Sequence, residues 1–327
     1  MRKHRLETLP TRIRVRAQVH SNSRARAQQG PAPLLLERTP RESEWIAEST
    51  FISEPHPFAM LGHQVSSWLS GLLWTRDLGG RYLGGTMTQN DPELLRLPVE
   101  PGAALGRTVR LPAVRDERDP GSAVILANAV TSAVRRRRGP CSFMFALDQL
   151  RYDQTPASEA LRQGALNGVA GDRIRRLESE PPYVALHMRR GDIDPNAHAA
   201  RWVLPEWYAE VIAKLQSDKA VAATRYLVFT QGAQAAEELR DALPGGVEVI
   251  GDGTRESDFA HMVAARLLVP APSSFSFTAA LASRGAVLAR SPWWHEIPDA
   301  GRWVPLTSGG DYEAAALARA MNSTVAS

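Results

Sequence analysis

Cysteine is almost absent from this sequence of 327 residues, which contains only Cys141. A single thiol excludes an internal disulfide and every zinc site built from several cysteines. It fits a reducing compartment, so we expect a cytoplasmic location. No apolar run approaches the roughly 20 residues of a membrane-spanning helix, so we expect no transmembrane segment. The first residues also lack the apolar stretch of a secretory signal.

Aromatic residues are missing from residues 1–44, which carry ten Lys/Arg and four Asp/Glu, a net charge of +6. The whole chain has a net charge of +4, which leaves about −2 for the other residues. The basic character therefore belongs to this first segment, which also has little apolar periodicity. We predict a disordered basic tail over 1–44, order from near Trp45, and no specific nucleic-acid partner.

Short apolar runs alternate with amphipathic segments from Pro181 onward. The runs predict strands at 183–188, 225–230, 247–251 and 286–290, and the segments between them predict helices at 204–218, 233–243, 257–269 and 273–285. The third of these helices runs into a short apolar segment, Leu267–Pro270. Strands separated by helices of this length form βαβ units with a parallel sheet.

The first half of the sequence shows this alternation less clearly. Residues 57–84 predict a strand, a glycine turn, an amphipathic helix and a second strand. Residues 85–120 suggest loops, and residues 122–130 are compatible with a strand or a buried helix. We predict two α/β domains, at 45–165 on the acceptor side and at 166–310 for nucleotide-sugar binding, and a C-terminal helix or tail at 311–327.

The stretch YVALHMRRGDI, residues 183–193, ends an apolar run with two arginines, a glycine and an aspartate. Ligands of open parallel sheets bind beyond the carboxyl ends of the strands, and guanidinium groups suit phosphate oxygens. On these residues alone, a phosphate site and a structural ion-pair network are equally compatible. An adhesive Arg-Gly-Asp tripeptide would need an exposed loop tip. A divalent cation on Asp192 and Asp194 would compete with the two arginines.

A second cluster, APSSFS at 271–276, follows an apolar segment and opens a predicted helix. The amides at a helix N-terminus bind anions, although a serine in this position commonly only caps the helix. Because both clusters follow strands of one parallel sheet, we expect them at the same edge. Together they predict a cradle for a nucleotide diphosphate.

Four motifs of the sequence resemble those of a known family. HMRRGD at 187–192 resembles the His-x-Arg-Arg-Gly-Asp motif of α-1,2-fucosyltransferases, which the α-1,6 and protein O-fucosyltransferases share loosely. SDFAHM at 257–262, with SSFSF at 273–277, resembles the third motif of the α-1,2 group. MLGHQ at 60–64 is similar to the N-terminal Gly-Leu-Gly-Asn-Gln motif, and LPEWYAEVIAKL at 204–215 resembles the helix after the arginine motif.

The resemblance implies a GT-B-like fold, in which two Rossmann-like domains with parallel sheets face a cleft. It implies an inverting, metal-independent glycosyltransferase that moves fucose from GDP-fucose to a hydroxyl of a glycan or other acceptor. GDP-fucose or another GDP-sugar is then the donor substrate, and no further cofactor is expected. The alternatives are a metal-dependent nucleotide-sugar transferase that uses Asp192 and Asp194, and a non-catalytic relative that binds a glycan or partner.

The resemblance also implies roles for individual residues. Arg189 should bind the β-phosphate and stabilise the leaving group, and Asp258 should accept hydrogen bonds from guanine. The expected nucleotide-binding residues are His187, Arg189, Arg190, Asp192, Asp258, Ser273, Ser274, Phe275, Ser276, Gly62 and Gln64. Candidates for the base that takes the acceptor's proton are Asp194, Glu206 and His63.

The sequence departs from the family motifs at several positions. The asparagine before Ser-Ser is Pro272 here, the asparagine of the first motif is His63, and the Phe-Ser-Asp-Asp turn is FTQG at 229–232. The family's Trp-Trp is replaced by Phe277-Thr278. These departures leave the donor sugar and the acceptor open.

Overall fold

The structure, a computed structural model, describes residues 34–54, 60–85, 93–114, 120–146, 153–221, 224–290, 297–298 and 301–323. Sheet A contains, in spatial order, β2 (Arg81–Gly85), β1 (Thr50–Ser53), β4 (Ser142–Phe145) and β3 (Thr108–Arg110). Sheet B contains β10 (Trp303–Leu306), β9 (Ala286–Arg290), β8 (Leu267–Val269), β5 (Tyr183–His187), β6 (Arg225–Phe229) and β7 (Val247–Ile250). All pairings in both sheets are parallel, which confirms the prediction of two α/β units with parallel sheets.

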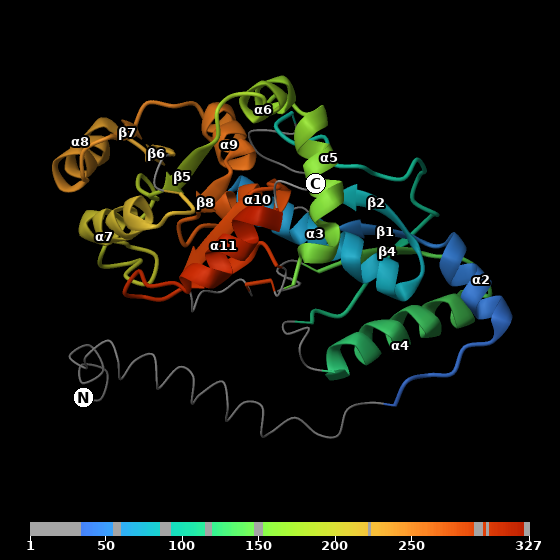
Figure 1. Cartoon of the computed structure of the whole chain (residues 1–327). Helices are drawn as coiled ribbons and strands as arrows, with labels where there is room; N and C mark the ends of the chain where they lie inside the picture. Colours follow the sequence, from blue (N-terminus) through green and yellow to red (C-terminus); the bar gives the residue numbers. More distant parts are fainter. Residues whose placement is uncertain are drawn as a thin grey trace, which may run out of the picture.

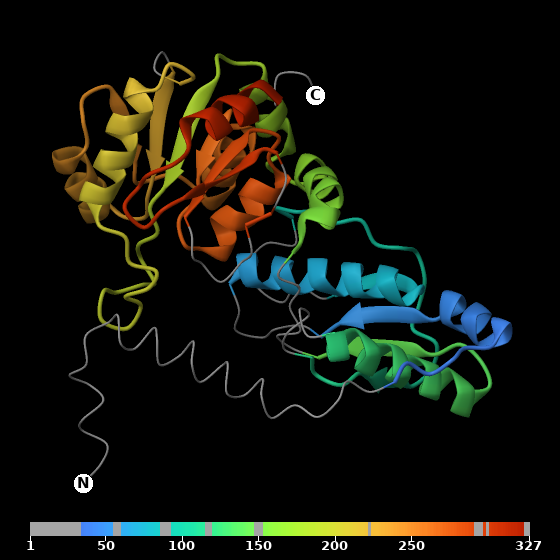
Figure 2. The ribbon, with the colours of Figure 1, turned by 60° about the horizontal axis from the view of Figure 1, so that its bottom comes forward.

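Sheet A lies between two long helices, α3 (Leu61–Leu78) and α4 (Pro120–Arg137), as Figure 2 shows. Its core is aromatic: Phe51 stacks on Phe143 and Phe145, with ring centroids 4.9 and 5.7 Å apart. The ambiguous run at 122–130 belongs to α4, because its buried residues Leu126 and Val130 recur at the spacing of a helix. None of the described helices is apolar over a length that would cross a bilayer.

A further helix, α2 (Pro40–Glu48), packs against α4 and begins earlier than expected (Figure 1). Thr39 and Glu42 form a capping box, and Arg135 on α4 donates to Glu42 at 2.6 Å. The prediction that order begins near Trp45 is therefore wrong: the structure describes the chain from Leu34, Leu36 N donates to Asn128 Oδ1 at 2.8 Å, and a capping box and an ion pair fix the start of α2. Residues 1–33 of the predicted tail lie outside the described residues.

Sheet B has helices on both faces. One face packs against α9 (Arg255–Ala264) and α10 (Ser274–Ala282), and the other against α7 (Pro205–Ser217), α8 (Ala233–Ala242) and α11 (Ala314–Ser323). Along β5, Tyr183 and Ala185 join the first core, whereas Val184 and Leu186 join the second. Burial on both faces explains why inner strands such as β5 and β9 read as continuous apolar runs.

One continuous apolar core joins the two units. α3 packs against β1 and β2 on one side and against α10 on the other, so it lies along the junction in Figure 2. The short helix η1 (Thr155–Ala157) leads into α5 (Ser158–Asn167), which packs on α10, and α6 (Gly171–Glu178) packs on α9. Because a large apolar interface restrains domain motion, the N-terminal ends of α3 and α10 are held in a fixed relation.

The predicted elements differ from the observed ones in both halves. In the second half, the helix predicted at 257–269 ends at Ala264, its last residues form the strand β8, and the strand β10 was not predicted. The first strand is β1 at Thr50–Ser53 rather than near residue 57, and residues 55–59 lie outside the described residues. The region expected to be loops contains the short strand β3. Between the two units, residues 158–180 predict a helix with a possible break at Gly171, and the structure has two helices, α5 and α6, separated by residues 168–170.

Replacing the central aromatic of sheet A tests this core. Phe143 is fully buried and stacked on Phe51, so Phe143→Ala should lower the free energy of unfolding by about 3–5 kcal/mol. Leu34, which is 90% exposed, provides a matched control, and Leu34→Ala should change it by less than about 0.5 kcal/mol. Urea denaturation measures both, and equal stability of the two variants would contradict the packing described.

Candidate functional site

The carboxyl edge of sheet B brings the predicted motifs together. Since its strands are parallel, the segments that follow β5, β6, β7 and β8 emerge at one edge. These segments are His187–Asp192, Thr230–Gly232, Asp252–Thr254 and Pro270–Ser273. The contact between Phe259 and Phe275, whose rings lie 5.8 Å apart, places the first turns of α9 and α10 beside each other.

Arg189 joins the loop after β5 to the start of α10. Its Nε and Nη2 donate to the two carboxylate oxygens of Asp192, Nε at 3.0 Å, and its Nη1 donates to Ser273 Oγ at 2.7 Å. Partial burial alone would raise the pKa of Asp192, but the hydrogen bonds and charge of Arg189 outweigh it and lower the pKa below its usual value. The Arg189 side chain keeps 17% of its surface exposed, so it is held in place and still reachable.

Ser273 is the N-cap residue of α10, yet its hydroxyl makes no capping hydrogen bond. The hydroxyl accepts from Arg189 instead, so the simple capping role considered from the sequence is wrong. The first helical hydrogen bond runs from Phe277 N to Ser273 O at 3.0 Å, so the amides of Ser274, Phe275 and Ser276 have no acceptor within the helix. This helix end therefore offers unpaired amides beside a guanidinium group.

Four buried polar atoms in this region have no hydrogen-bond partner among the described residues. They are His187 Nδ1, Arg190 Nε, Thr230 Oγ1 and Asp258 Oδ1. A buried polar atom left without a partner costs about 1–3 kcal/mol. A bound molecule or an ordered water would complete the hydrogen bonding of such atoms.

His187 ends β5 and is neutral at physiological pH. Burial, and next the charge of Arg189, lowers the pKa of its imidazole to about 3. The ring makes an edge contact with Phe275, with centroids 6.1 Å apart, and Tyr208 Oη donates to the His187 carbonyl at 2.9 Å. A neutral imidazole has one donor and one acceptor nitrogen, so it can make a directional hydrogen bond to an uncharged group.

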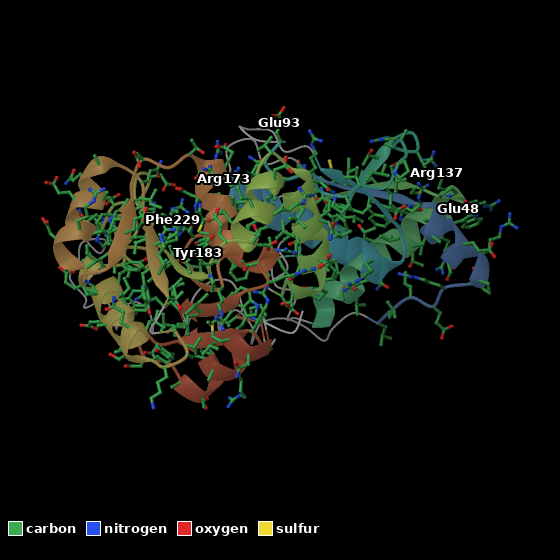
Figure 3. The ribbon with its side chains drawn as sticks, turned by 45° about the horizontal axis from the view of Figure 1, so that its top comes forward. Glu48, Glu93, Arg137, Arg173, Tyr183 and Phe229 are labelled. Atoms are coloured by element: carbon green, nitrogen blue, oxygen red, sulfur yellow. The ribbon has the colours of Figure 1, made fainter. Side chains whose placement is uncertain are left out.

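Asp258 lies in the first turn of α9 but is not its cap. Thr254 caps the helix by accepting from Ser257 N at 3.2 Å. Burial, followed by the negative charges of Asp252 and Glu256, raises the pKa of Asp258 to about 7, with partial opposition from Arg173. Figure 3 labels this arginine on α6. With this pKa, Asp258 is partly ionised at neutral pH. Its buried Oδ1 has no hydrogen-bond partner among the described residues, so the carboxyl group is available to a ligand.

Arg190 shapes the loop that presents Arg189. Its Nη2 donates to Val203 O at 2.9 Å, its Nη1 donates to Arg189 O at 3.0 Å, and its guanidinium lies 3.7 Å from the Trp202 ring centroid. Gly191, which lies between Arg190 and Asp192, has a φ of +87°, and a Cβ there would overlap Gln231 Oε1. Only glycine fits this turn without strain.

Of the remaining motif residues, Ser276 and Gln64 are buried, whereas Ser274 and Phe275 are partly exposed. Ser276 is fully buried, and its hydroxyl donates to Ala271 O and Ser273 O at 3.2 and 3.3 Å. Gln64 is 4% exposed in the first turns of α3. Ser274 and Phe275 are partly exposed at the start of α10 and remain placed for a ligand.

Gly62 brings the other unit to the same point. A Cβ on Gly62 would lie 2.5 Å from the Ser274 carbonyl carbon and would also overlap Phe275 N. The first turns of α3 and α10 are therefore in direct contact, rather than on opposite sides of the cleft that the resemblance implied between the two domains. Both helix N-termini carry partial positive charge, so an anion held next to them would be stabilised by both.

The candidate bases lie on three separate elements. Asp194 Oδ1 accepts from the amides of Asn196 and Ala197 at 2.9 and 2.8 Å, so this carboxylate caps its own turn, and the bond from Ala197 is the main reason its pKa is lowered. Glu206 is exposed in the first turn of α7, and His63 is partly exposed in the first turn of α3.

The acidic pair considered for a metal is otherwise engaged. Asp192 directs both oxygens at Arg189, and Asp194 caps a turn. Across the described ranges, no group of three or more His, Cys, Asp or Glu side chains is arranged to hold a metal ion. The geometry therefore favours an anion-binding role for the arginine loop over the Asp192–Asp194 metal alternative.

Some residues at the two sheet edges were not predicted from the sequence. Thr230, with its buried unpaired hydroxyl, and Gln231 follow β6. Glu54 follows β1 at the carboxyl edge of sheet A and pairs with Arg110. The FTQG turn could have indicated the first two, because it follows a predicted strand. Glu54 could not be found while the first strand was placed near residue 57.

No protein-family model and no curated protein sequence matches this chain. Its fold is similar to that of POFUT1 in complex with GDP, at 12% identity and a TM-score of 0.49, over 79% of this chain and 98% of that one. It is also similar to POFUT1 in complex with GDP-fucose, at 12% identity and a TM-score of 0.47, over 72% and 94%.

A second likeness is to the E. coli heptosyltransferase WaaC with ADP-2-deoxy-2-fluoro heptose. It has 13% identity and a TM-score of 0.38, over 84% of this chain and 99% of that one. At these identities and TM-scores, no activity or substrate of this chain follows from either likeness.

The contact between the two helix N-termini can be tested by adding one methyl group. Gly62→Ala places a Cβ against the backbone of Ser274 and Phe275, so it should lower the free energy of unfolding by about 1–3 kcal/mol. Gly245→Ala is the control, because a Cβ at Gly245 meets nothing within 4 Å. Thermal and urea unfolding measure both, and a Gly62 variant as stable as the control would show that α3 and α10 do not touch there.

Proposed function

We propose that this protein is a glycosyltransferase that transfers fucose, or another sugar, from its GDP-linked form to a hydroxyl group of a glycan or small-molecule acceptor. The observation that carries the proposal is the position of Arg189, which Asp192 and Ser273 hold beside the free amides of α10. A guanidinium group and a helix N-terminus together suit a diphosphate. The motif resemblance supports GDP-fucose as the donor.

The same groups suit the chemistry of transfer. As the bond between the sugar C1 and the β-phosphate oxygen breaks, negative charge grows on the diphosphate. Donors that are already in place stabilise that charge, and Arg189 and the amides of Ser274 and Phe275 are such donors. The acceptor oxygen forms the new bond to C1 from the opposite side, which inverts the configuration, and its proton passes to a base or to water. We propose that Arg189 supplies the positive charge that a metal supplies in other transferases.

Asp258 supports recognition of guanine. Guanine presents two adjacent N–H donors on one edge, and a carboxylate can accept from both, whereas adenine offers an acceptor nitrogen there. Asp258 has a buried, unpaired oxygen, and the start of its helix lies beside the start of α10. We therefore propose that the nucleotide lies across the first turns of α9 and α10, with guanine at Asp258 and the diphosphate at Arg189.

The base for the acceptor remains among Asp194, Glu206 and His63, with Glu54 as an additional candidate. Glu54 follows the second strand of sheet A in spatial order, at the edge where an acceptor would approach from the other unit. Asp194 is the weakest of the four, because its Oδ1 already accepts two backbone hydrogen bonds.

Removing the guanidinium of Arg189 tests the diphosphate site. With EDTA present, Arg189→Met should weaken binding of GDP and GDP-fucose by about 10- to 100-fold, as expected for losing hydrogen bonds to a charged group. Calorimetric titration measures this, with GDP-mannose and UDP as competing ligands and Arg319→Met, an exposed arginine on α11, as the control. Unchanged affinity in Arg189→Met would refute the assignment.

Recognition of guanine by Asp258 predicts a pH dependence. The ionised carboxylate accepts hydrogen bonds, and its pKa in the free protein is about 7, so GDP affinity should fall as the pH drops from 8 to 6. Asp258→Asn should bind GDP more weakly at pH 8 and lose this part of the pH dependence. The phosphate also titrates near pH 6, so guanosine, which has no phosphate, is the cleaner ligand. A guanosine affinity that does not change with pH in the wild type would contradict the role of Asp258.

A further inference from the structure

Two arginines hold the C-terminal end of α10, the end opposite the proposed diphosphate site. Arg302 Nη2 donates to Ala280 O at 2.9 Å and to Leu281 O at 3.3 Å. Arg162 Nη1 donates to Ala282 O at 3.1 Å. The last three carbonyls of the helix therefore all accept from guanidinium groups, which come from α5 and from the turn before β10.

These arginines are unusual for simple helix caps. Arg162 is only 4% exposed, and its one carboxylate partner in the described part of the chain is Glu178, at 2.7 Å. Arg302 also donates to Gly285 O at 3.1 Å and lies over the Trp303 ring, but within the described residues it pairs with no carboxylate. Burial, and then the charge of Arg162, lowers the pKa of Arg302 to about 10, which still leaves it charged at neutral pH. One buried and one partly buried guanidinium group thus share a single acidic partner among the described residues.

The N-terminal end of α10, opposite these arginines, carries the proposed diphosphate site. The helix has nine residues, so its length is about 14 Å at 1.5 Å per residue. Its sides are buried in the apolar core, with Phe277, Ala279 and Leu281 each at most 2% exposed. Charge acts over a longer distance through such an interior than through water. The positive charge at the C-terminal end neutralises the negative end of the helix dipole, and the positive N-terminal end remains directed at the site.

We propose that Arg302, supported by Arg162, is a positioning residue for the diphosphate site: it fixes α10 from its far end and strengthens the attraction of its first turn for anions. This inference rests on the proposed function, because it requires a diphosphate at Ser273–Phe275. It also explains why two guanidinium groups, one buried and one partly buried, meet at a helix end that one would cap.

The test compares a charged ligand with an uncharged one in the same variants. Arg302→Gln keeps a side-chain donor for the carbonyls but removes the charge, whereas Arg302→Lys keeps the charge. GDP should bind Arg302→Gln roughly three- to tenfold more weakly than the wild type, as expected for losing one charge about 14 Å away in a protein interior. Guanosine, which lacks the diphosphate, should bind equally, and Arg302→Lys should retain most of the GDP affinity. Arg319→Met is the matched control for an exposed arginine.

The outcomes separate this inference from the proposed function. Equal weakening of GDP and guanosine in Arg302→Gln would mean that the arginine acts only on the packing of α10, and the inference would be overturned. Unchanged GDP affinity in Arg302→Gln would overturn it as well. If the wild type binds neither ligand, the proposed function itself fails. Should Arg302→Gln not fold, Arg162→Gln and Arg162→Lys make the same comparison from the other arginine.

Discussion

The candidate site depends on the hydrogen bond between Arg189 and Ser273, which joins segments 84 residues apart. Through it, the loop after β5 and the first turn of α10 become one surface. Asp192 fixes the guanidinium from the other side and leaves it partly exposed. Without this link, the arginine would be a mobile side chain and the helix end an ordinary N-terminus. With it, a cation and several amides are arranged in advance for an anion, which is the condition for strong electrostatic stabilisation.

The two units of the chain support this arrangement from opposite sides. Gly62 lets α3 approach α10 closely, so the start of α10 is fixed by sheet A as well as by sheet B. At the far end, Arg162 reaches α10 from α5, which lies between the two units in the chain. The helix is thus held at its start, along its sides and at its end. A short helix held in this way can direct its dipole at a ligand without local rearrangement.

Strand burial, strand length and tertiary packing explain which parts of this structure could be predicted from the sequence. In sheet B, strands such as β5 are buried on both faces and flanked by amphipathic helices, so their apolar runs were clear. In sheet A, β1 is four residues long, and the apolar residues near 57 were mistaken for it. The parallel order placed the arginine and serine motifs at one edge. The partner of Ser273, the contact at Gly62 and the arginines at the end of α10 depend on tertiary packing, which local patterns do not encode.

A crystal structure of the protein with GDP tests the central claim most directly. The account predicts that the β-phosphate lies within hydrogen-bonding distance of the Arg189 guanidinium and of the first-turn amides of α10, with the guanine edge on Asp258. A diphosphate bound away from Arg189, or a nucleotide with its base far from Asp258, would contradict the account. In that case the Arg-Arg-Gly-Asp turn would be a structural ion pair that only holds α10 to sheet B.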